Sequence, residues 1–321
     1  MNTIQEIADV LKRLNSAVIF THTRPDGDTI GSGVALSRAL SLLKIRNEVV
    51  NDGEIPEKFS FLKGAEAIRR QIDFDAEGYI CVDSSDENRL GELSRAFLRG
   101  AGKKVTVNID HHVSNTRFCK YNYVVPCSSN CQIIAQLITA LGVPFDEIIS
   151  NAIMTGIVTD SGTFSHLDVN GETFRAAALA SDGGANVNEI TYELYRKQSK
   201  MRADLYLDVL RKMRFLLDDR LAIVCVTQDD LMRRSLKSDA TEGIVDFGLT
   251  IDSVEVSVCL MEVKQGQYKA SFRSKKVNVN LVAGMFGGGG HVLASGCMLF
   301  GDYEEAVDRI RFAVSCHMED A

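Results

Sequence analysis

The sequence of 321 residues has no tryptophan, only four prolines, and no apolar run near the ~20 residues that a membrane span needs. Its eight cysteines form no Cys-x-x-C pair, so a zinc ribbon or a thioredoxin-like redox site is not expected. Low-complexity stretches and sustained heptads are also missing, which excludes disordered and coiled-coil classes. The first residues contain no apolar core of a signal peptide. We therefore expect a cytoplasmic protein with reduced thiols and no membrane partner.

The chain also lacks an excess of positive charge. Lysine and arginine number 36 against 43 aspartates and glutamates, a formal net charge of −7. Proteins that hold long nucleic acids without sequence preference are usually basic overall. We therefore expect no long nucleic acid as a partner, and any phosphate must be bound in a local site that supplies its own positive charge.

Buried strands alternating with helices are the main pattern in the first half of the chain. At about 150 residues per domain, the length favours two domains. Short apolar runs at Ala17–Thr21, Tyr79–Val82 and Val105–Ile109 predict buried strands. Helical spacing of apolar residues predicts helices over Ser128–Leu141 and Phe145–Val158. This alternation predicts an α/β fold with a parallel sheet covered on both faces.

The pattern changes after residue 185. A polar segment leads into an apolar stripe at i, i+4 spacing from Leu205 to Leu217, and neither glycine nor proline interrupts it. From Val254 onward, apolar and polar residues alternate with a period of two, which predicts strands. The predicted organisation is a parallel-sheet domain over 1–185, a connecting helix over 186–215, and a smaller mixed α/β domain over 216–321.

Acidic and histidine side chains follow the predicted strands of the first domain, at the point where each strand ends. The carboxyl ends of parallel strands face one crevice, so side chains from these positions converge there. Helix caps, turns or buried hydrogen-bonded histidines could explain each residue singly, but those explanations do not predict clusters after successive strands. The set consists of His22, Asp26, Asp28, Asp83, Asp110, His111, His112 and Asp160.

This set has the composition of a site for two divalent cations. Asp26 can join His22 on one ion while Asp28 serves another, and Asp83 is placed to bridge them. Asp160 and one of the two adjacent histidines would complete the second ion. Mixed imidazole and carboxylate ligands suit manganese or cobalt better than magnesium. Two such ions can activate a water and stabilise an in-line displacement at phosphorus, while the other histidine hydrogen-bonds the phosphate or protonates the leaving oxygen.

Four segments carry a resemblance to a known family. The segments HTRPDGDTIGS, CVDSSD, NIDHH and GIVTDSG occur in the order of the four motifs of the DHH phosphoesterases, over most of residues 15–165. The resemblance implies a two-manganese site in which Asp110 orients a histidine and His112 faces the scissile phosphate. It also implies that Asp83 is shared between the ions. The implied ligands are His22, Asp26 and Asp83 for one ion, and Asp28, Asp83, His111 and Asp160 for the other.

A glycine run marks the second domain. Gly287–Gly290 let the backbone approach a ligand closely, His291 follows directly, and Arg273 is suited to bidentate contact with a phosphate. The segment GGGGHVLASG is similar to the substrate-binding domain known as DHHA1. The substrate contacts implied by that resemblance are Arg273, Ser274, Gly288, Gly289, Gly290 and His291.

A chain with only these two domains resembles the nanoRNase and 3′-phosphoadenosine 5′-phosphate (pAp) phosphatase group. The resemblance implies hydrolysis of oligoribonucleotides of two to five nucleotides to mononucleotides, and of pAp to AMP, by a metal-activated water. Manganese is the expected metal, with cobalt or magnesium as alternatives. The nearest alternative is a phosphodiesterase for cyclic di-AMP or pApA. An inorganic pyrophosphatase and a non-catalytic dinucleotide-binding module are further alternatives, and an exposed apolar stripe could support a homodimer.

Overall fold

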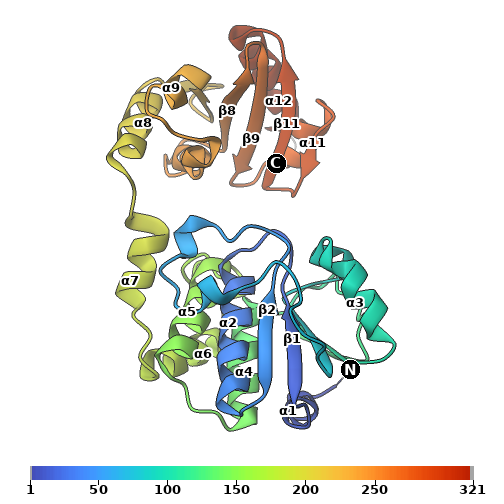
Figure 1. The fold of residues 1–321 in the computed structure, drawn as a ribbon. Helices are drawn as coiled ribbons and strands as arrows, with labels where there is room; N and C mark the ends of the chain where they lie inside the picture. Colours follow the sequence, from blue (N-terminus) through green and yellow to red (C-terminus); the bar gives the residue numbers. More distant parts are fainter. Residues whose placement is uncertain (1, 319–321) are drawn as a thin grey trace. The chain divides into compact units, whose positions relative to one another are not determined.

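The computed structural model describes residues 2–318. The chain divides into two compact units, Met1–Lys197 and Gln198–Ala321. Each unit has its own sheet and its own hydrophobic core (Figure 1). Among the described residues, no helix is both long enough and apolar enough to span a bilayer.

A five-stranded parallel sheet forms the centre of the first unit, as predicted. The strand order is β2-β1-β3-β4-β5, and every neighbouring pair is parallel. The three strands predicted from apolar runs are the central ones, whereas the two edge strands were missed because their sequences, RNEVV and YNYV, are partly polar. The strands are β1 Ser16–Phe20, β2 Arg46–Val50, β3 Gly78–Val82, β4 Val105–Asp110 and β5 Tyr121–Val124.

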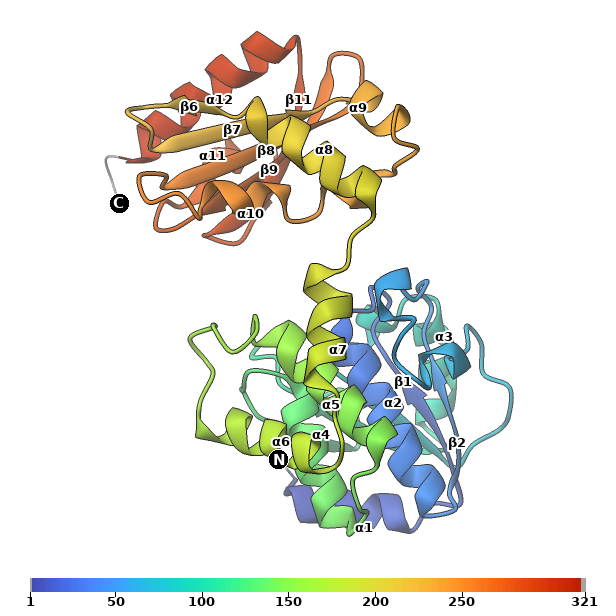
Figure 2. The ribbon, with the colours of Figure 1, turned by 90° about the vertical axis from the view of Figure 1, so that its left-hand side faces the viewer.

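Helices cover both faces of this sheet, and Figure 2 looks onto the larger layer, which contains α2, α4 and α5. Successive residues of β1 point to opposite faces: Ala17 and Ile19 pack into the core beneath this layer, and Val18 and Phe20 pack beneath α3. Burial on both faces explains why the central strands are continuous apolar runs. The helices are α1 Ile4–Lys12, α2 Gly27–Leu42, α3 Leu93–Ala101, α4 Asn130–Leu141, α5 Glu147–Asp160, α6 Gly171–Asp182 and α7 Val187–Thr191, with short turns η1 Glu57–Phe59, η2 Ala65–Ala67, η3 Glu87–Leu90 and η4 Tyr192–Arg196.

Glycines allow α2 and α5 to pack closely, and this contact positions acidic residues. A Cβ atom on Gly27 would lie 2.4 Å from Thr159 Oγ1, and one on Gly31 would lie 2.4 Å from the Ala152 carbonyl oxygen. The first turn of α2 therefore lies against the last turn of α5. As a result Asp28, at the start of α2, and Asp160, at the end of α5, are brought to the same side of the unit.

Gly156→Ala is expected to destabilise the protein by about 1–3 kcal/mol, the usual cost of overpacking. The new Cβ would lie 2.2 Å from Cys131 Sγ and 2.6 Å from Asp28 Oδ1. Within a helix, alanine is more favourable than glycine by about 1 kcal/mol, so helix propensity alone would stabilise the variant. A decrease in the free energy of unfolding would therefore be due to the clash. Urea unfolding measures it, with Gly102→Ala as the control because nothing lies within 4 Å of the Cβ added at Gly102. An unchanged unfolding midpoint for Gly156→Ala would contradict the close approach.

The second unit is a mixed α/β structure, as predicted. Its six strands have the order β10-β11-β9-β8-β7-β6, in which β7 and β8 are parallel and the other neighbours are antiparallel. The strands are β6 Arg214–Leu216, β7 Leu221–Val226, β8 Val256–Lys264, β9 Gln267–Ser274, β10 Gly289–Gly290 and β11 Ala294–Phe300. The helices are α8 Lys200–Arg211, α9 Gln228–Met232, α10 Ile244–Gly248, α11 Val279–Gly284 and α12 Tyr303–Met318, with the short turn η5 Ser238–Thr241.

The segment between the sheets differs from the single connecting helix predicted over 186–215. It contains α7 and a π-helical turn, η4, then a short extended stretch, and then α8. Lys197 has extended backbone, and the Ser199 hydroxyl accepts the Arg202 N–H and so begins a new helix. The compact units are divided between Lys197 and Gln198, and β6 begins within the predicted helix, at Arg214. The apolar stripe from Leu205 continues past the end of α8, so the spacing alone did not show this end.

Candidate metal centre

The first turn of α2 brings two aspartates to the site from one short segment. Asp26 is the N-cap of α2: its Oδ1 accepts the N–H groups of Asp28 and Thr29 at 3.1 and 3.0 Å. Its Oδ2 lies 3.4 Å from His22 Nε2. Asp28 follows two residues later, inside the first turn of the helix. The helix separates the two carboxylates, so Asp26 faces His22 and Asp28 faces another part of the site.

Asp83 lies between two histidines at the end of β3. Its Oδ2 is 3.4 Å from His22 Nε2, and its Oδ1 is 3.3 Å from His111 Nε2. The side chain is only 2% exposed, and the backbone is left-handed, with φ +54°. A non-glycine residue in this conformation stores strain of the kind found at functional sites. Among the described residues, neither Asp83 Oδ1 nor the buried His22 Nδ1 has a hydrogen-bond partner, and such orphaned atoms are candidates for bonds to a ligand.

The two adjacent histidines at the end of β4 have different partners. His111 Nδ1 is 2.9 Å from the Cys127 carbonyl oxygen, so its Nε2 faces the carboxylates of Asp28 and Asp160, at 3.9 and 3.5 Å. His112 Nδ1 instead lies 2.8 Å from Asp110 Oδ1. This geometry is consistent with His111 as the expected cation ligand, and it makes His112 the histidine that Asp110 orients.

Further polar groups, which the sequence analysis did not single out, hold these carboxylates. The Asn115 amide donates to Asp110 Oδ2 at 2.6 Å, and Asp110 is fully buried. The N–H of Cys131, at the start of α4, donates to Asp28 Oδ1 at 2.8 Å. Asn115 lies in a loop and Cys131 uses its backbone, so no motif spacing points to either.

Three groups of side chains could hold an ion, each with ligand atoms within 4.8 Å of one another. One has the residues of the expected set around His22, and another has three of the four residues of the expected set around His111, without Asp83. The third places His112 with Asp83 and His111. Closely spaced nitrogen and oxygen ligands that include four carboxylates suit divalent cations. The groups are His22–Asp26–Asp83, Asp28–His111–Asp160 and Asp83–His111–His112.

Mutual repulsion and burial shift the protonation of this cluster. Burial, reinforced by the charge of Asp83, holds the pKa of Asp28 well above its usual range and raises that of Asp160 to about 7. Burial opposes charge on the histidines too, but neighbouring carboxylates raise the pKa of His22 to about 9 and of His111 to about 11. Against burial, the two histidines lower the pKa of Asp83. Without cations, protons on the histidines therefore balance the negative charge.

The glycine run of the second unit forms a tight hairpin beside Arg273. Arg273 pairs with Ala294 across β9 and β11, and β10 pairs with β11 through Gly289 and Gly290. Arg273 Nε is 3.2 Å from Asp246 Oδ1. These positions stay predicted substrate contacts. The structure brings Arg273, Gly289 and Gly290 together where β9 ends and β11 begins, next to the edge strand β10.

Ser274 and Gly288 have structural roles in this part of the sheet. Ser274 is buried, and its hydroxyl accepts the Lys276 N–H at 3.1 Å. A Cβ on Gly288 would lie 2.2 Å from the Gly296 carbonyl oxygen, so only glycine fits there. His291 is exposed at the turn that follows, where its N–H donates to the Ala294 carbonyl.

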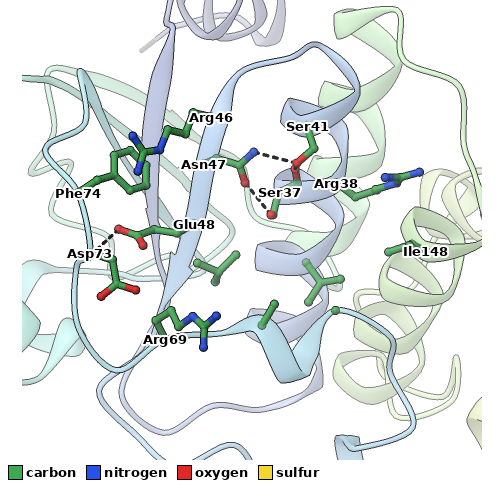
Figure 3. A pocket seen from close by; sticks show the side chains of 14 residues that line it. Ser37, Arg38, Ser41, Arg46, Asn47, Glu48, Arg69, Asp73, Phe74 and Ile148 are labelled. Atoms are coloured by element: carbon green, nitrogen blue, oxygen red, sulfur yellow. Dashed lines mark hydrogen bonds between the residues drawn. The ribbon is translucent and has the colours of Figure 1, made fainter.

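The cavities lined by described residues of the first unit include two of several hundred Å³. One, of about 470 Å³, lies against β2 and contains none of the clustered acids or histidines. Figure 3 shows Arg46 stacked over Phe74 and Asn47 hydrogen-bonded to Ser37 and Ser41, so much of its polar lining is already partnered. The other, of about 570 Å³, is lined in part by His111 and is therefore next to the cluster.

A parallel α/β sheet with carboxylates and histidines at the carboxyl ends of its strands is an arrangement suited to a metal-dependent phosphoesterase. Comparison with known families gives the same answer: residues 16–157 match the model described as "DHH family, N-terminal domain", and residues 220–315 match the "DHHA1 domain". The chain belongs to the DHH phosphoesterase family and is an enzyme of that family.

Named relatives share almost the full length of the chain. It is 32% identical to the "Bifunctional oligoribonuclease and PAP phosphatase NrnA" of Thermus thermophilus, over 96% of this chain and 92% of that protein. It is 23% identical to the protein of the same name from Bacillus subtilis, over 95% of each chain. Among solved structures, an exopolyphosphatase-related protein from Bacteroides fragilis is similar, with a TM-score of 0.86 and 27% identity, over 98% of this chain and 95% of that one.

Proposed function

We propose that this enzyme hydrolyses oligoribonucleotides of two to five nucleotides to mononucleotides, and pAp to AMP, with two Mn²⁺ ions. The observation that carries the proposal is the pair of His–carboxylate groups on either side of Asp83. The names of the relatives from T. thermophilus and B. subtilis support the substrate class. The net charge of −7 supports short substrates, since no excess of basic residues is present to follow a long strand.

Each type of side chain in the site has a distinct task in this proposal. His22, Asp26 and Asp83 would hold one cation, and Asp28, His111 and Asp160 would hold the other, with Asp83 shared between the two. Bound there, the cations would supply an activated water and neutralise charge on the phosphate.

His112 is the candidate acid for the leaving group. Its Nδ1 is bound to Asp110, so Nε2 is the ring nitrogen left for substrate, and the side chain is partly exposed. A protonated Nε2 can hydrogen-bond the phosphate or give its proton to the leaving oxygen. Asp110 stabilises the imidazolium and, held by Asn115, fixes the ring orientation.

A product assay with Mn²⁺ tests the proposal. It compares pAp, a 5′-labelled diribonucleotide, cyclic di-AMP and a long oligoribonucleotide at equal concentration. Cleavage of the first two with little action on the long strand is the expected result. A clear preference for cyclic di-AMP would replace the substrate class while keeping the site, and tight binding without turnover of any of them would overturn the proposal in favour of a binding module.

A further inference from the structure

The cavity of about 570 Å³ beside His111 has a lining that the catalytic groups do not explain. Its wall comes from the loop after β4, the loop after β5 and the α5–α6 connection. Because His111 is both a candidate cation ligand and part of this wall, the cavity lies next to the candidate metal centre. Its volume falls within the usual range for small-molecule sites.

Two aliphatic side chains on this wall are exposed to an unusual degree. Leu167 is fully exposed and Val113 is 88% exposed, and they are the two most exposed large apolar side chains in the described part of the chain. Leaving such groups in water costs free energy that burial against a flat apolar ligand would recover. Their occurrence on one wall, from two separate loops, points to a ligand rather than to chance exposure.

The loop that carries Leu167 is anchored on both sides of it. His166 Nδ1 lies 2.7 Å from the Asp160 carbonyl oxygen, and the Phe164 ring stacks on Phe174 with centroids 5.2 Å apart. Asn170 caps α6 by accepting the Glu172 N–H. Leu167 is therefore presented at a defined place beside the metal centre.

The polar groups of the cavity wall suit a nucleobase and not a phosphate. No lysine or arginine among residues 2–318 lines the cavity, although phosphate sites usually carry one. Asp168 does line it, and within the same residues its carboxylate has no hydrogen-bond donor and no ion-pair partner. A carboxylate can accept hydrogen bonds from the amino or ring N–H groups of a nucleobase.

From this lining we infer a subsite for the nucleobase adjacent to the scissile phosphate, with Val113 and Leu167 in contact with the base and Asp168 accepting a hydrogen bond from its edge. The inference rests on the proposed function, because that substrate class places an aromatic base next to each phosphate. Pyrophosphate or polyphosphate would have no group to fill this cavity.

The test compares wild type with the double variant Val113→Ser, Leu167→Ser in the Mn²⁺-loaded full-length enzyme. For a diribonucleotide, KM is expected to rise about tenfold with little change in kcat, because contacts to a base contribute binding. The same compound is also tested with each base in turn replaced by an abasic ribose. When the base that fills the subsite is the one removed, wild type and variant are expected to have equal KM. Leu98→Ser is the control, since Leu98 is also exposed but lies on α3 and not on the cavity wall.

A binding measurement separates this inference from the proposed function. Calorimetric titration with AMP and with ribose 5-phosphate needs no turnover. The double variant is expected to weaken AMP binding about tenfold and to leave ribose 5-phosphate binding unchanged. Equal effects on both ligands, or none on either, would overturn the subsite, whether or not the enzyme cleaves RNA. A dimer that the double variant dissociates, with AMP binding unaffected, would instead assign the surface to a second copy of the chain.

Discussion

Replacing Asp83 by asparagine is expected to lower the rate of hydrolysis at least about 10³-fold, which corresponds to about 4 kcal/mol of lost transition-state stabilisation. Asp83 contacts both His22 and His111 and is shared by two of the candidate ion groups, so its charge serves both cations. Asparagine has the same size and is among the few residues that adopt a left-handed backbone readily. The fold should therefore be retained, as circular dichroism can verify.

Calorimetric titration of Asp83→Asn with Mn²⁺ separates loss of cations from loss of chemistry. We expect fewer ions bound, or both bound far more weakly. Asp230→Asn is the matched control: Asp230 is a mostly buried carboxylate of the second unit that caps α9 by accepting the Thr227 N–H and hydroxyl. Its loss should cost about 1 kcal/mol of stability without loss of activity. Retention of most activity in Asp83→Asn would contradict a two-cation site that shares this residue.

Binding of Mn²⁺ to the metal-free enzyme is expected to release at least about two protons near pH 7.5, because cation ligands must be deprotonated. The neighbouring carboxylates raise the pKa values of His22 and His111 to about 9 and about 11, so both histidines are protonated before the cations bind. Titration calorimetry in buffers of different ionisation enthalpy measures the released protons. His22→Gln should release about one fewer.

The same shifts predict opposite pH dependences for the metal-free and loaded forms. A pKa raised by folding adds stability below its unfolded value, and this stability is lost as pH rises through the folded value. For His22 that window runs from its ordinary pKa of 6.5 to about 9. The melting temperature of the metal-free protein should therefore fall as the pH rises from 6.5 to 9. Over the same range, the increase in melting temperature caused by adding Mn²⁺ under nitrogen should become larger. If Mn²⁺ released no protons and raised the melting temperature equally at every pH, the raised pKa values of the two histidines would be contradicted.

The central strands could be predicted because a buried strand needs a continuous apolar sequence. The positions of the acidic motifs could be predicted because they directly follow these strands. A strand such as β3, covered on both faces, must be apolar throughout, and the carboxyl end of a parallel strand is where Asp83 has to emerge. The edge strands β2 and β5 were missed because one side of each is not paired within the sheet, and their sequences are partly polar. The break after Lys197 was missed because a serine cap looks the same as a serine on a helix surface.

The sequence by itself therefore determined the fold class, the family, and the residue types available to bind cations. Only the tertiary structure determined their partners: that Nδ1 of His111 faces a carbonyl while Nδ1 of His112 faces Asp110, and that Asn115 holds that aspartate. It also showed that Val113 and Leu167, far apart in sequence, line one cavity. The physical reason is that periodicity records whether a side chain is buried, whereas the direction of a ring nitrogen or the meeting of two loops depends on contacts across the whole unit.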